Sequence, residues 1–585
     1  MLKPGNTVNR LIFSTIVIGY LFFAYTYRWT GNDGKKHETI INSDGRGHYD
    51  YLPHFFIYGY GANRQFDNAI HIKHEKSFVN KYYAGTAISQ LPFFTAAYLY
   101  CNITGDPLTG FSTPFQIAVS LAALFYFFAA LYFLYKLLVV HFNILPHNAA
   151  FVLLVFSFGS TILHYAVVAP AFSHVYTFFW IAFFFWQVSK ISRGQYSQKV
   201  FIYCLFALSM VFVIRPVNIL VVLFIPVFFD SWAGMRSCFK SNFACNRKYI
   251  FIGAAVALLP VLAQCLAWYA QTGSFIIWSY KHEGFNWTSP QFANFLFSYR
   301  KGLFIYTPLL LVAVVGFYFL YKANRWKFTW AFISLVVIIY VLCSWWCWHY
   351  AGGFGMRPMT DFLFIFMILF AFILQNIYRP IAKIGIKLLV AFTVFLNLVF
   401  TYQFYADIIN PFSMDKQKFW SVFLKTGDAY RNCFGGMKDE PPYAPKGFKL
   451  LAENKFTFDE KSGGVLNTKG SEFPLEIVGN LSSGKSYSHY FKVMLRRKVN
   501  LENAGNDISI AIATKQGWET GYAFIQYIRL KENCLEKTGE WVCSEYTVST
   551  FNGELYNKTF FVYLYNPAKE EMEIDDVKVE CYSVN

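Results

Sequence analysis

The sequence predicts an α-helical polytopic membrane protein with about 10–11 membrane segments, followed by a jelly-roll-like β-sandwich domain. Of its 585 residues, 55% are hydrophobic and 21% are aromatic. As far as residue 406 the apolar residues form runs close to the roughly 20 residues that a helix needs to cross a bilayer. Beyond residue 440 the pattern changes to short runs of β-branched and aromatic residues between polar turns.

The runs divide the chain into a membrane domain at 1–406 with a first outer loop at 30–112, a linker at 407–440 and an extracytoplasmic β domain at 441–585. The first run lacks a small-residue cleavage site after it, so an uncleaved helix is expected. Two short runs joined by Arg215-Pro216 are expected to form a hairpin that crosses part of the bilayer. The apolar runs lie near 11–27, 115–140, 149–166, 171–189, 199–214, 217–229, 249–270, 302–321, 328–346, 359–377 and 386–406.

Charge is distributed unevenly between the two parts. Residues 1–406 hold 29 Lys and Arg but 10 Asp and Glu, a net charge of +19, whereas the remainder has a net charge of −2. The cations fall on alternate loops, which the positive-inside rule assigns to the cytoplasm. This predicts an integral protein of the bacterial cytoplasmic membrane with a cytoplasmic N-terminus and the β domain outside. Nucleic acid is not an expected partner, because the soluble part offers no basic face.

The C-terminal part is expected to bury a core of its own and to have a carbohydrate-binding role. Its predicted strands include 491–495, 508–513, 560–565 and 574–579. Four cysteines in an exported domain permit two disulfides in any of three pairings, and a bond between Cys534 and Cys543 across a turn is favoured. The four are Cys433, Cys534, Cys543 and Cys581.

Acidic residues of the membrane part gather in the first outer loop, where seven of the ten occur. An ion-driven transporter is expected to keep its carboxylates in the middle of helices instead. The segment Ser-Asp-Gly-Arg-Gly-His-Tyr-Asp at 43–50 places Asp44 between a serine and a glycine, so this carboxylate can approach a substrate closely. The alternative is an Asx turn or a helix N-cap.

The expected outer loops also carry cations beside aromatic residues. Such cations suit a lipid-linked phosphate, with which Lys and Arg form charge-assisted hydrogen bonds. The alternative is snorkelling within an interfacial aromatic belt. The glycines in Gly352-Gly353-Phe354-Gly355 favour close backbone approach. The cationic and His residues of these loops are Lys81, His174, Arg300, Lys301, His349 and Arg357.

With these residues the membrane part resembles the GT-C superfamily of membrane glycosyltransferases. It is most similar to bacterial relatives of the dolichyl-phosphate-mannose protein mannosyltransferases and of the aminoarabinose transferase. The resemblance covers about 10–406 and rests on the order of several loop motifs rather than on any one of them. They are Asp44, Lys81-Tyr82, Phe172 to His174, Arg300 to Phe304, and Trp345 to Arg357.

The resemblance implies an inverting transfer of a sugar from a polyprenyl-phosphate donor to a hydroxyl acceptor at the outer membrane face. It implies that Asp44 is the catalytic general base and that Lys81, Arg300 and Arg357 hold the donor phosphate. Substrate-binding roles fall to Tyr82, His174, Lys301 and His349.

One departure from the family pattern concerns the catalytic loop. Many relatives carry two adjacent acids there, but Gly45 follows Asp44 in this chain. Asp50 is therefore the second candidate for the catalytic carboxylate. No cofactor and no metal ligand are predicted, and dependence on a divalent metal stays open.

Three other functions fit parts of the sequence. A polysaccharide polymerase or ligase also uses polyprenyl carriers, but such proteins usually lack a large C-terminal β domain. A transporter is expected to have internal repeats and mid-membrane charges, of which Arg215 is the one example. A non-enzymatic scaffold that displays a sugar-binding domain would tolerate replacement of Asp44.

Overall fold

The computed structural model describes the chain in two compact units. The first comprises Met1–Phe297, Lys301–Tyr350 and Phe354–Thr401, and the second comprises Ser298–Arg300, Ala351–Gly353 and Tyr402–Asn585. The described residues are 4–30, 39–59, 71–74, 77–280, 283–411, 414–431, 448–456, 465–480, 488–499, 508–515, 522–530, 539–550 and 559–584.

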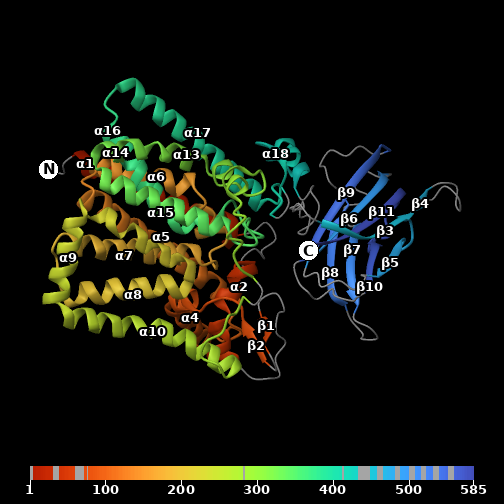
Figure 1. Ribbon diagram of the computed structural model, residues 1–585, viewed down its shortest axis with the longest axis horizontal. Helices are drawn as coiled ribbons and strands as arrows, with labels where there is room; N and C mark the ends of the chain where they lie inside the picture. The colour runs from red at the N-terminus through yellow and green to blue at the C-terminus, as the bar shows by residue number, and fades with distance from the viewer. Residues whose placement is uncertain are drawn as a thin grey trace. The chain divides into compact units, whose positions relative to one another are not determined.

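The first unit is a bundle of helices with a two-stranded hairpin beside it (Figure 1). Its longer helices are α1 (Pro4–Ala24), α4 (Gly85–Thr104), α5 (Thr113–Lys136), α6 (Pro146–Gly159), α7 (His174–Ser192), α8 (Gln198–Ile214), α9 (Trp232–Cys245), α10 (Arg247–Thr272), α15 (Arg325–Cys343), α16 (Leu363–Asn376) and α17 (Pro380–Tyr405). Shorter elements are α2 (Ser43–Tyr49), α3 (Tyr51–Pro53), β1 (His71–His74), β2 (Ser77–Asn80), α11 (Phe292–Phe297), α12 (Leu303–Tyr306), α13 (Pro308–Val314) and α14 (Gly316–Ala323). Among the described residues of this unit, four segments are π-helical, namely η1 (Tyr25–Trp29), η3 (His54–Tyr58), η4 (Leu137–His141) and η5 (His164–Val168). Two are 3₁₀-helices, namely η6 (Pro216–Phe228) and η7 (Arg357–Phe362).

The predicted membrane character of this unit is confirmed. Within the described residues, six helices are long and apolar enough to cross a membrane, and a bent pair formed by Pro216–Phe228 and Trp232–Ser241 makes up to seven. Shorter apolar helices lie at Pro146–Gly159, Gln198–Ile214 and Pro308–Ala323. The six are Thr7–Trp29, Thr113–His141, Arg247–Thr272, Arg325–Cys343, Arg357–Asn376 and Pro380–Tyr405.

The predicted hairpin around Arg215 appears as two elements, α8 and η6, that contact one another. η6 is a 3₁₀-helix of 13 residues. At a rise of about 2.0 Å per residue it is roughly 26 Å long, which is close to the thickness of the hydrocarbon core. The length of η6 thus does not by itself distinguish a partial crossing from a full one, and the partial crossing stays a prediction.

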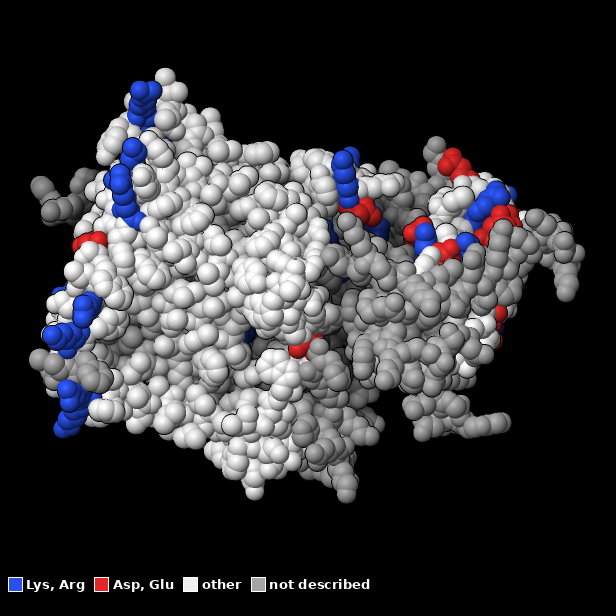
Figure 2. Space-filling view, in the orientation of Figure 1, with Lys and Arg blue, Asp and Glu red and all other residues white. Residues whose placement is uncertain are grey.

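The cation-bearing loops of the unit meet at one end of the bundle, as the sequence predicts. Figure 2 shows Lys and Arg side chains gathered along one edge of the helical unit. Because the loops touch one another in a chain of contacts, they lie together at this end of the bundle. Those contacts are Ile191 with Cys238, Asp230 with Lys327, Lys327 with the Phe142 ring, and Leu145 with Gln375.

Helices α13 and α14 pack against α16, which brings the segments near 302–321 and 359–377 side by side. Gly316 makes the close approach necessary. A Cβ atom built on Gly316 would lie 2.1 Å from the carbonyl oxygen of Leu369, a distance that real Cβ atoms do not show. The glycine therefore lets two backbones touch, a device common in membrane helix packing.

The second unit contains the C-terminal strands and the short helix α18 (Lys416–Val422), which lies inside the predicted linker. Its sheets have the strand orders β5-β10-β7-β8 and β3-β11-β6-β9, with β4 paired to β11, and all described pairings are antiparallel. The strands are β3 (Phe448–Phe456), β4 (Leu466–Asn467), β5 (Glu476–Asn480), β6 (Ser488–Val499), β7 (Ser509–Lys515), β8 (Tyr522–Arg529), β9 (Trp541–Thr550), β10 (Thr559–Tyr565) and β11 (Met572–Val584).

Both sheets contribute to one buried apolar cluster. Phe560 of β10 packs edge to face against Phe491 of β6, with ring centroids 5.1 Å apart, although the two strands belong to different sheets. The four strands predicted from the sequence are confirmed, and the jelly-roll arrangement stays a prediction. Cys534 lies outside the described residues, so its pairing with the exposed Cys543 also stays a prediction.

Candidate functional site

Helix α2 carries Asp44 in its first turn and packs closely against two other segments. A Cβ on Gly45 would lie 2.7 Å from the Cβ of Ala171, and a Cβ on Gly47 would lie 2.2 Å from the ring of Tyr82. The two glycines therefore allow α2 to dock between these neighbours. Close packing of the helix, rather than free approach of a substrate, is what these glycines provide.

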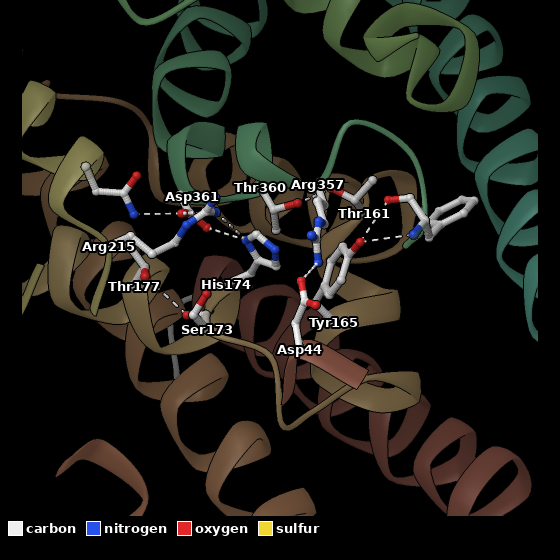
Figure 3. A network of polar contacts seen from close by, with 12 residues as sticks. Asp44, Thr161, Tyr165, Ser173, His174, Thr177, Arg215, Arg357, Thr360 and Asp361 are labelled. Atoms are coloured by element: carbon white, nitrogen blue, oxygen red, sulfur yellow. Dashed lines mark hydrogen bonds and ion pairs between the residues drawn. The ribbon is translucent and has the colours of Figure 1, made fainter. Parts of the chain in front are cut away.

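The Asp44 carboxylate uses both oxygens in contacts with distant residues, and Figure 3 shows the contact with Arg357. The Tyr82 hydroxyl donates a hydrogen bond of 2.6 Å to Oδ1, and Nη1 of Arg357 lies 2.5 Å from Oδ2. These contacts differ from an Asx turn or an N-cap, in which backbone N–H groups would bind the carboxylate. Burial raises the pKa of Asp44, but Arg357 and the Tyr82 hydrogen bond outweigh it and lower the pKa to about 2. Asp44 is therefore ionised at neutral pH.

Arg357 begins η7 and is held between Asp44 and an aromatic ring. Its guanidinium carbon lies 5.5 Å from the centroid of the Phe172 ring, and its side chain is 12% exposed. The buried Nε of Arg357 has no hydrogen-bond partner among the described residues. This donor beside the carboxylate is therefore available to a ligand that supplies an acceptor, since leaving a buried donor without one is costly.

The loop before Arg357 is fixed against the bundle by Gly355 and Phe354. Gly355 has φ +59, and a Cβ there would lie 3.0 Å from the side chain of Thr161. The Tyr165 hydroxyl donates to the carbonyl of Phe354 at 3.1 Å and accepts from its N–H at 3.0 Å. The Arg357 backbone is thereby positioned by η5 and by the end of α6.

A second carboxylate, Asp361, lies one turn beyond Arg357 and is fully buried. Nδ1 of His174 lies 2.7 Å from Oδ1 of Asp361, and the Asn218 amide donates to Oδ2 at 2.7 Å. Nη1 of Arg215 lies 3.3 Å from the same Oδ2 and 3.5 Å from Nδ1 of His174. Figure 3 shows this group next to the pair of Asp44 and Arg357. Asp361 therefore holds the 20% exposed Arg215 side chain beside the candidate site.

His48 lies in the same region on α2, with its ring centroid 4.7 Å from that of Tyr82. The residue is 6% exposed, and its Nδ1 has no hydrogen-bond partner among the described residues. Burial lowers the pKa of His48 to about 3, and the nearby charges of Arg215 and Arg357 act in the same direction against the opposite effect of Asp44. The imidazole is therefore neutral and retains hydrogen-bonding capacity for a substrate.

Other predicted site residues have partners of their own. Lys81 forms an ion pair with Glu283 and lies 5.4 Å from the centroid of the Tyr280 ring. Asp50, the second candidate for the catalytic residue, forms a buried pair with His54, with Oδ2 and Nδ1 2.9 Å apart. The structure thus brings Asp44, rather than Asp50, into contact with Arg357.

Within the described residues, Lys301 and His349 are not among the side chains that contact Asp44 or Arg357. Lys301 is 2% exposed, and His349 is 6% exposed with its Nε2 3.5 Å from Sγ of Cys347. Arg300 belongs to the second compact unit, whereas Arg357 belongs to the first. Their roles stay predictions.

The sequence interpretation missed His48, Arg215, Asn218 and Asp361 as site residues. Asp361 and Arg215 carried a signal, since an ionisable residue within an apolar run marks a function or a buried partner. His48 and Asn218 carried none. Among the described residues, no group of three or more His, Cys, Asp or Glu is arranged to hold a metal ion.

Similarity to known proteins is found in structure rather than in sequence. No protein-family model matches the chain, and no curated protein matches it in sequence. A similar solved structure is the cryo-EM structure of arabinosyltransferase EmbB from Mycobacterium smegmatis, with 10% sequence identity and a TM-score of 0.31. The similarity covers 93% of this chain and 64% of that one. The chain thus spans less than two thirds of the length of that structure.

Proposed function

We propose that the protein is a membrane glycosyltransferase of GT-C type that transfers a sugar, with inversion, from a polyprenyl-phosphate donor to a hydroxyl acceptor at the outer membrane face. The observation that carries the proposal is the ion pair of Asp44 and Arg357. This ion pair joins the carboxylate and the phosphate-binding cation that the family resemblance names independently. The two residues are far apart in the sequence, near the beginning and near the end of the membrane domain.

In the proposed reaction the acceptor oxygen attacks the anomeric carbon of the donor sugar. The bond from that carbon to the phosphate oxygen breaks, and its electron pair leaves with polyprenyl phosphate. Asp44 accepts the proton of the acceptor hydroxyl as general base. Cations around the leaving phosphate stabilise the charge that develops on it.

Two arginines support a phosphate site beside Asp44. Nε of Arg357 has no hydrogen-bond partner within the described part of the chain, and Arg215 is held in place by the buried carboxylate of Asp361. Arginine suits this role because its planar guanidinium matches phosphate oxygens in pairs. Lys81 is engaged by Glu283, so in this proposal it contributes to the donor site after exchanging that partner. Arg300 is retained from the family resemblance.

The low pKa of Asp44 suggests how the base is activated. A carboxylate with a pKa of about 2 is a weak base while Arg357 neutralises it. When the donor phosphate draws Arg357 away, Asp44 loses its main stabilising charge and becomes more basic. Donor binding thus precedes proton transfer in the proposed order.

The experiment that tests the proposal compares Asp44→Asn with Asp50→Asn. Cell-surface glycans are profiled by mass spectrometry in cells that produce the wild type, either variant or no protein. Because a general base contributes about 10²–10⁴-fold, Asp44→Asn is expected to abolish the glycan product while the protein level stays normal. Normal product from Asp44→Asn together with loss in Asp50→Asn would identify Asp50 as the catalytic carboxylate instead.

Donor binding is tested separately by titrating purified variants with the donor lipid extracted from these cells. Arg357→Ala, Arg215→Ala and Arg300→Ala are each expected to weaken the apparent affinity by roughly 1.5–3 kcal/mol, the value of a hydrogen bond to a charged group. Asp44→Asn should still bind donor. Unchanged affinity in all three arginine variants would leave the phosphate site without support.

A further inference from the structure

Three cations converge on one indole ring at the end of α7 remote from the candidate site. Nζ of Lys136 lies 5.6 Å, Nζ of Lys190 5.3 Å and the guanidinium carbon of Arg193 5.5 Å from the centroid of a Trp186 ring. Lys136 ends α5, whereas the other two follow Trp186 by four and seven positions. All four side chains are half-buried.

This cluster, Lys136, Lys190 and Arg193 around Trp186, has no acidic partner among the described residues. Lys190 donates to the Gln187 side chain at 3.3 Å, and Nε of Arg193 donates to the Ser189 carbonyl at 2.9 Å. Asp230, an acid at this end of the bundle, pairs with Lys327 instead. Three positive charges are thus held close together at partly buried positions, where water screens their repulsion incompletely.

The length of α7 places the cluster relative to the membrane. The helix runs from His174, beside Asp361, to Ser192, beside Arg193. Its 19 residues span roughly 28 Å at about 1.5 Å per residue, which is close to the thickness of the hydrocarbon core. The cluster therefore lies at the membrane face opposite to the Asp44 site. Tyr132, which Lys136 contacts, is 52% exposed.

We propose that this cluster binds the phosphate of an anionic glycerophospholipid headgroup. A phosphate diester supplies the negative charge that the three cations lack, and it accepts charge-assisted hydrogen bonds from each of them. The indole is suited to the headgroup level of a bilayer, where Trp is enriched. The positive-inside rule alone does not explain this arrangement. That rule predicts cations in cytoplasmic loops, but it does not predict that three of them surround one aromatic ring.

The test is native mass spectrometry of the full chain in detergent with added phosphatidylglycerol or phosphatidylcholine. The wild type is expected to retain phosphatidylglycerol preferentially. Lys190→Gln/Arg193→Gln is expected to lose affinity for phosphatidylglycerol by roughly 30-fold, since each of the two basic residues near an anionic headgroup contributes about 1 kcal/mol.

A matched control is Lys322→Gln/Arg325→Gln, which also removes one Lys and one Arg. Each of these cations lies over a tyrosine ring of its own, Lys322 over Tyr318 and Arg325 over Tyr321, rather than over a shared ring. The control variant is expected to keep wild-type affinity. The charge-preserving exchange Lys190→Arg/Arg193→Lys should also keep it, which separates charge from a change in folding.

Other outcomes would overturn the proposal. Equal loss in the cluster and control variants would indicate a diffuse effect of net charge. Equal retention of both lipids by the wild type would indicate no headgroup preference. Displacement of phosphatidylglycerol by micromolar inorganic phosphate would identify a site for the free anion rather than for a lipid.

Discussion

Two carboxylates of the helical unit contact arginine, but their surroundings differ. Asp44 is 26% exposed at its side chain and has a tyrosine and an arginine as partners. Asp361 is fully buried among His174, Arg215 and Asn218. The first can exchange partners when a substrate enters, whereas loss of any contact of the second leaves a charge unpaired in the interior. Under the proposed function, this contrast favours a chemical role for Asp44 and a positioning role for Asp361.

The depressed pKa of Asp44 predicts a pH dependence of stability. Its pKa is lowered from 3.8 to about 2, so the folded state favours the ionised carboxylate. The stabilisation, about 2 kcal/mol, is present above pH 4 and is lost as the pH falls toward 2. Thermal unfolding of the purified protein at pH 5, 4 and 3 should show this loss, and Asp44→Asn should flatten the curve. Parallel curves for both proteins would contradict the assignment.

Removing the buried carboxylate should destabilise the fold strongly. Asp361→Asn leaves Arg215 beside a neutral group and is expected to cost about 3–5 kcal/mol. Asp230→Asn is the control, because Asp230 also forms one ion pair but its side chain is 84% exposed. That change should cost under about 1 kcal/mol. The two variants are compared by the shift in their thermal unfolding midpoints relative to the wild type. A shift in Asp361→Asn no larger than that in Asp230→Asn would show that the buried network adds no stability.

At the scale of elements, the contact of α14 with α16 depends on one missing side chain. Gly316→Ala would place a methyl group against the backbone of Leu369, which cannot move as a flexible side chain can. The expected cost is about 3 kcal/mol or more, at the upper end of the range for overpacking. Gly385→Ala is the control, since nothing lies within 4 Å of its added Cβ and alanine favours helix. Gly385→Ala should leave the unfolding midpoint unchanged or raise it.

The elements were largely predictable from the sequence because apolar run length decides which segments enter a membrane. The lysine loops were also assigned correctly to one side. The β strands followed from β-branched and aromatic runs.

The polar network was harder to predict. From the sequence, Arg215 was interpreted as a turn residue because Pro216 follows it. Its partner Asp361 lies 146 positions away in the sequence. A single sequence carries no signal that pairs two such residues. The roles of Gly45 and Gly47 were likewise hidden, because a close approach to Ala171 or Tyr82 depends on tertiary packing.

At the scale of the molecule, the cation-bearing end of the bundle predicts the orientation of the chain. With those loops in the cytoplasm, a C-terminal reporter that is active only in the cytoplasm should be silent, and one active only outside should be functional. A reporter placed after Lys136 should give the opposite result. Cytoplasmic activity at the C-terminus would reverse the topology and move Asp44 to the other face.

The buried pair of Arg215 and Asp361 also constrains how the protein is made. Ribosomes add about 5–20 residues per second, so Arg215 leaves the ribosome roughly 7–30 s before the aspartate that neutralises it, 146 positions later. During that interval its charge has to stay in water, in the insertion channel or against a membrane chaperone. The segment around Arg215 is therefore expected to settle in the lipid only after α16 arrives, so its dependence on the insertion machinery lasts for about a quarter of the synthesis.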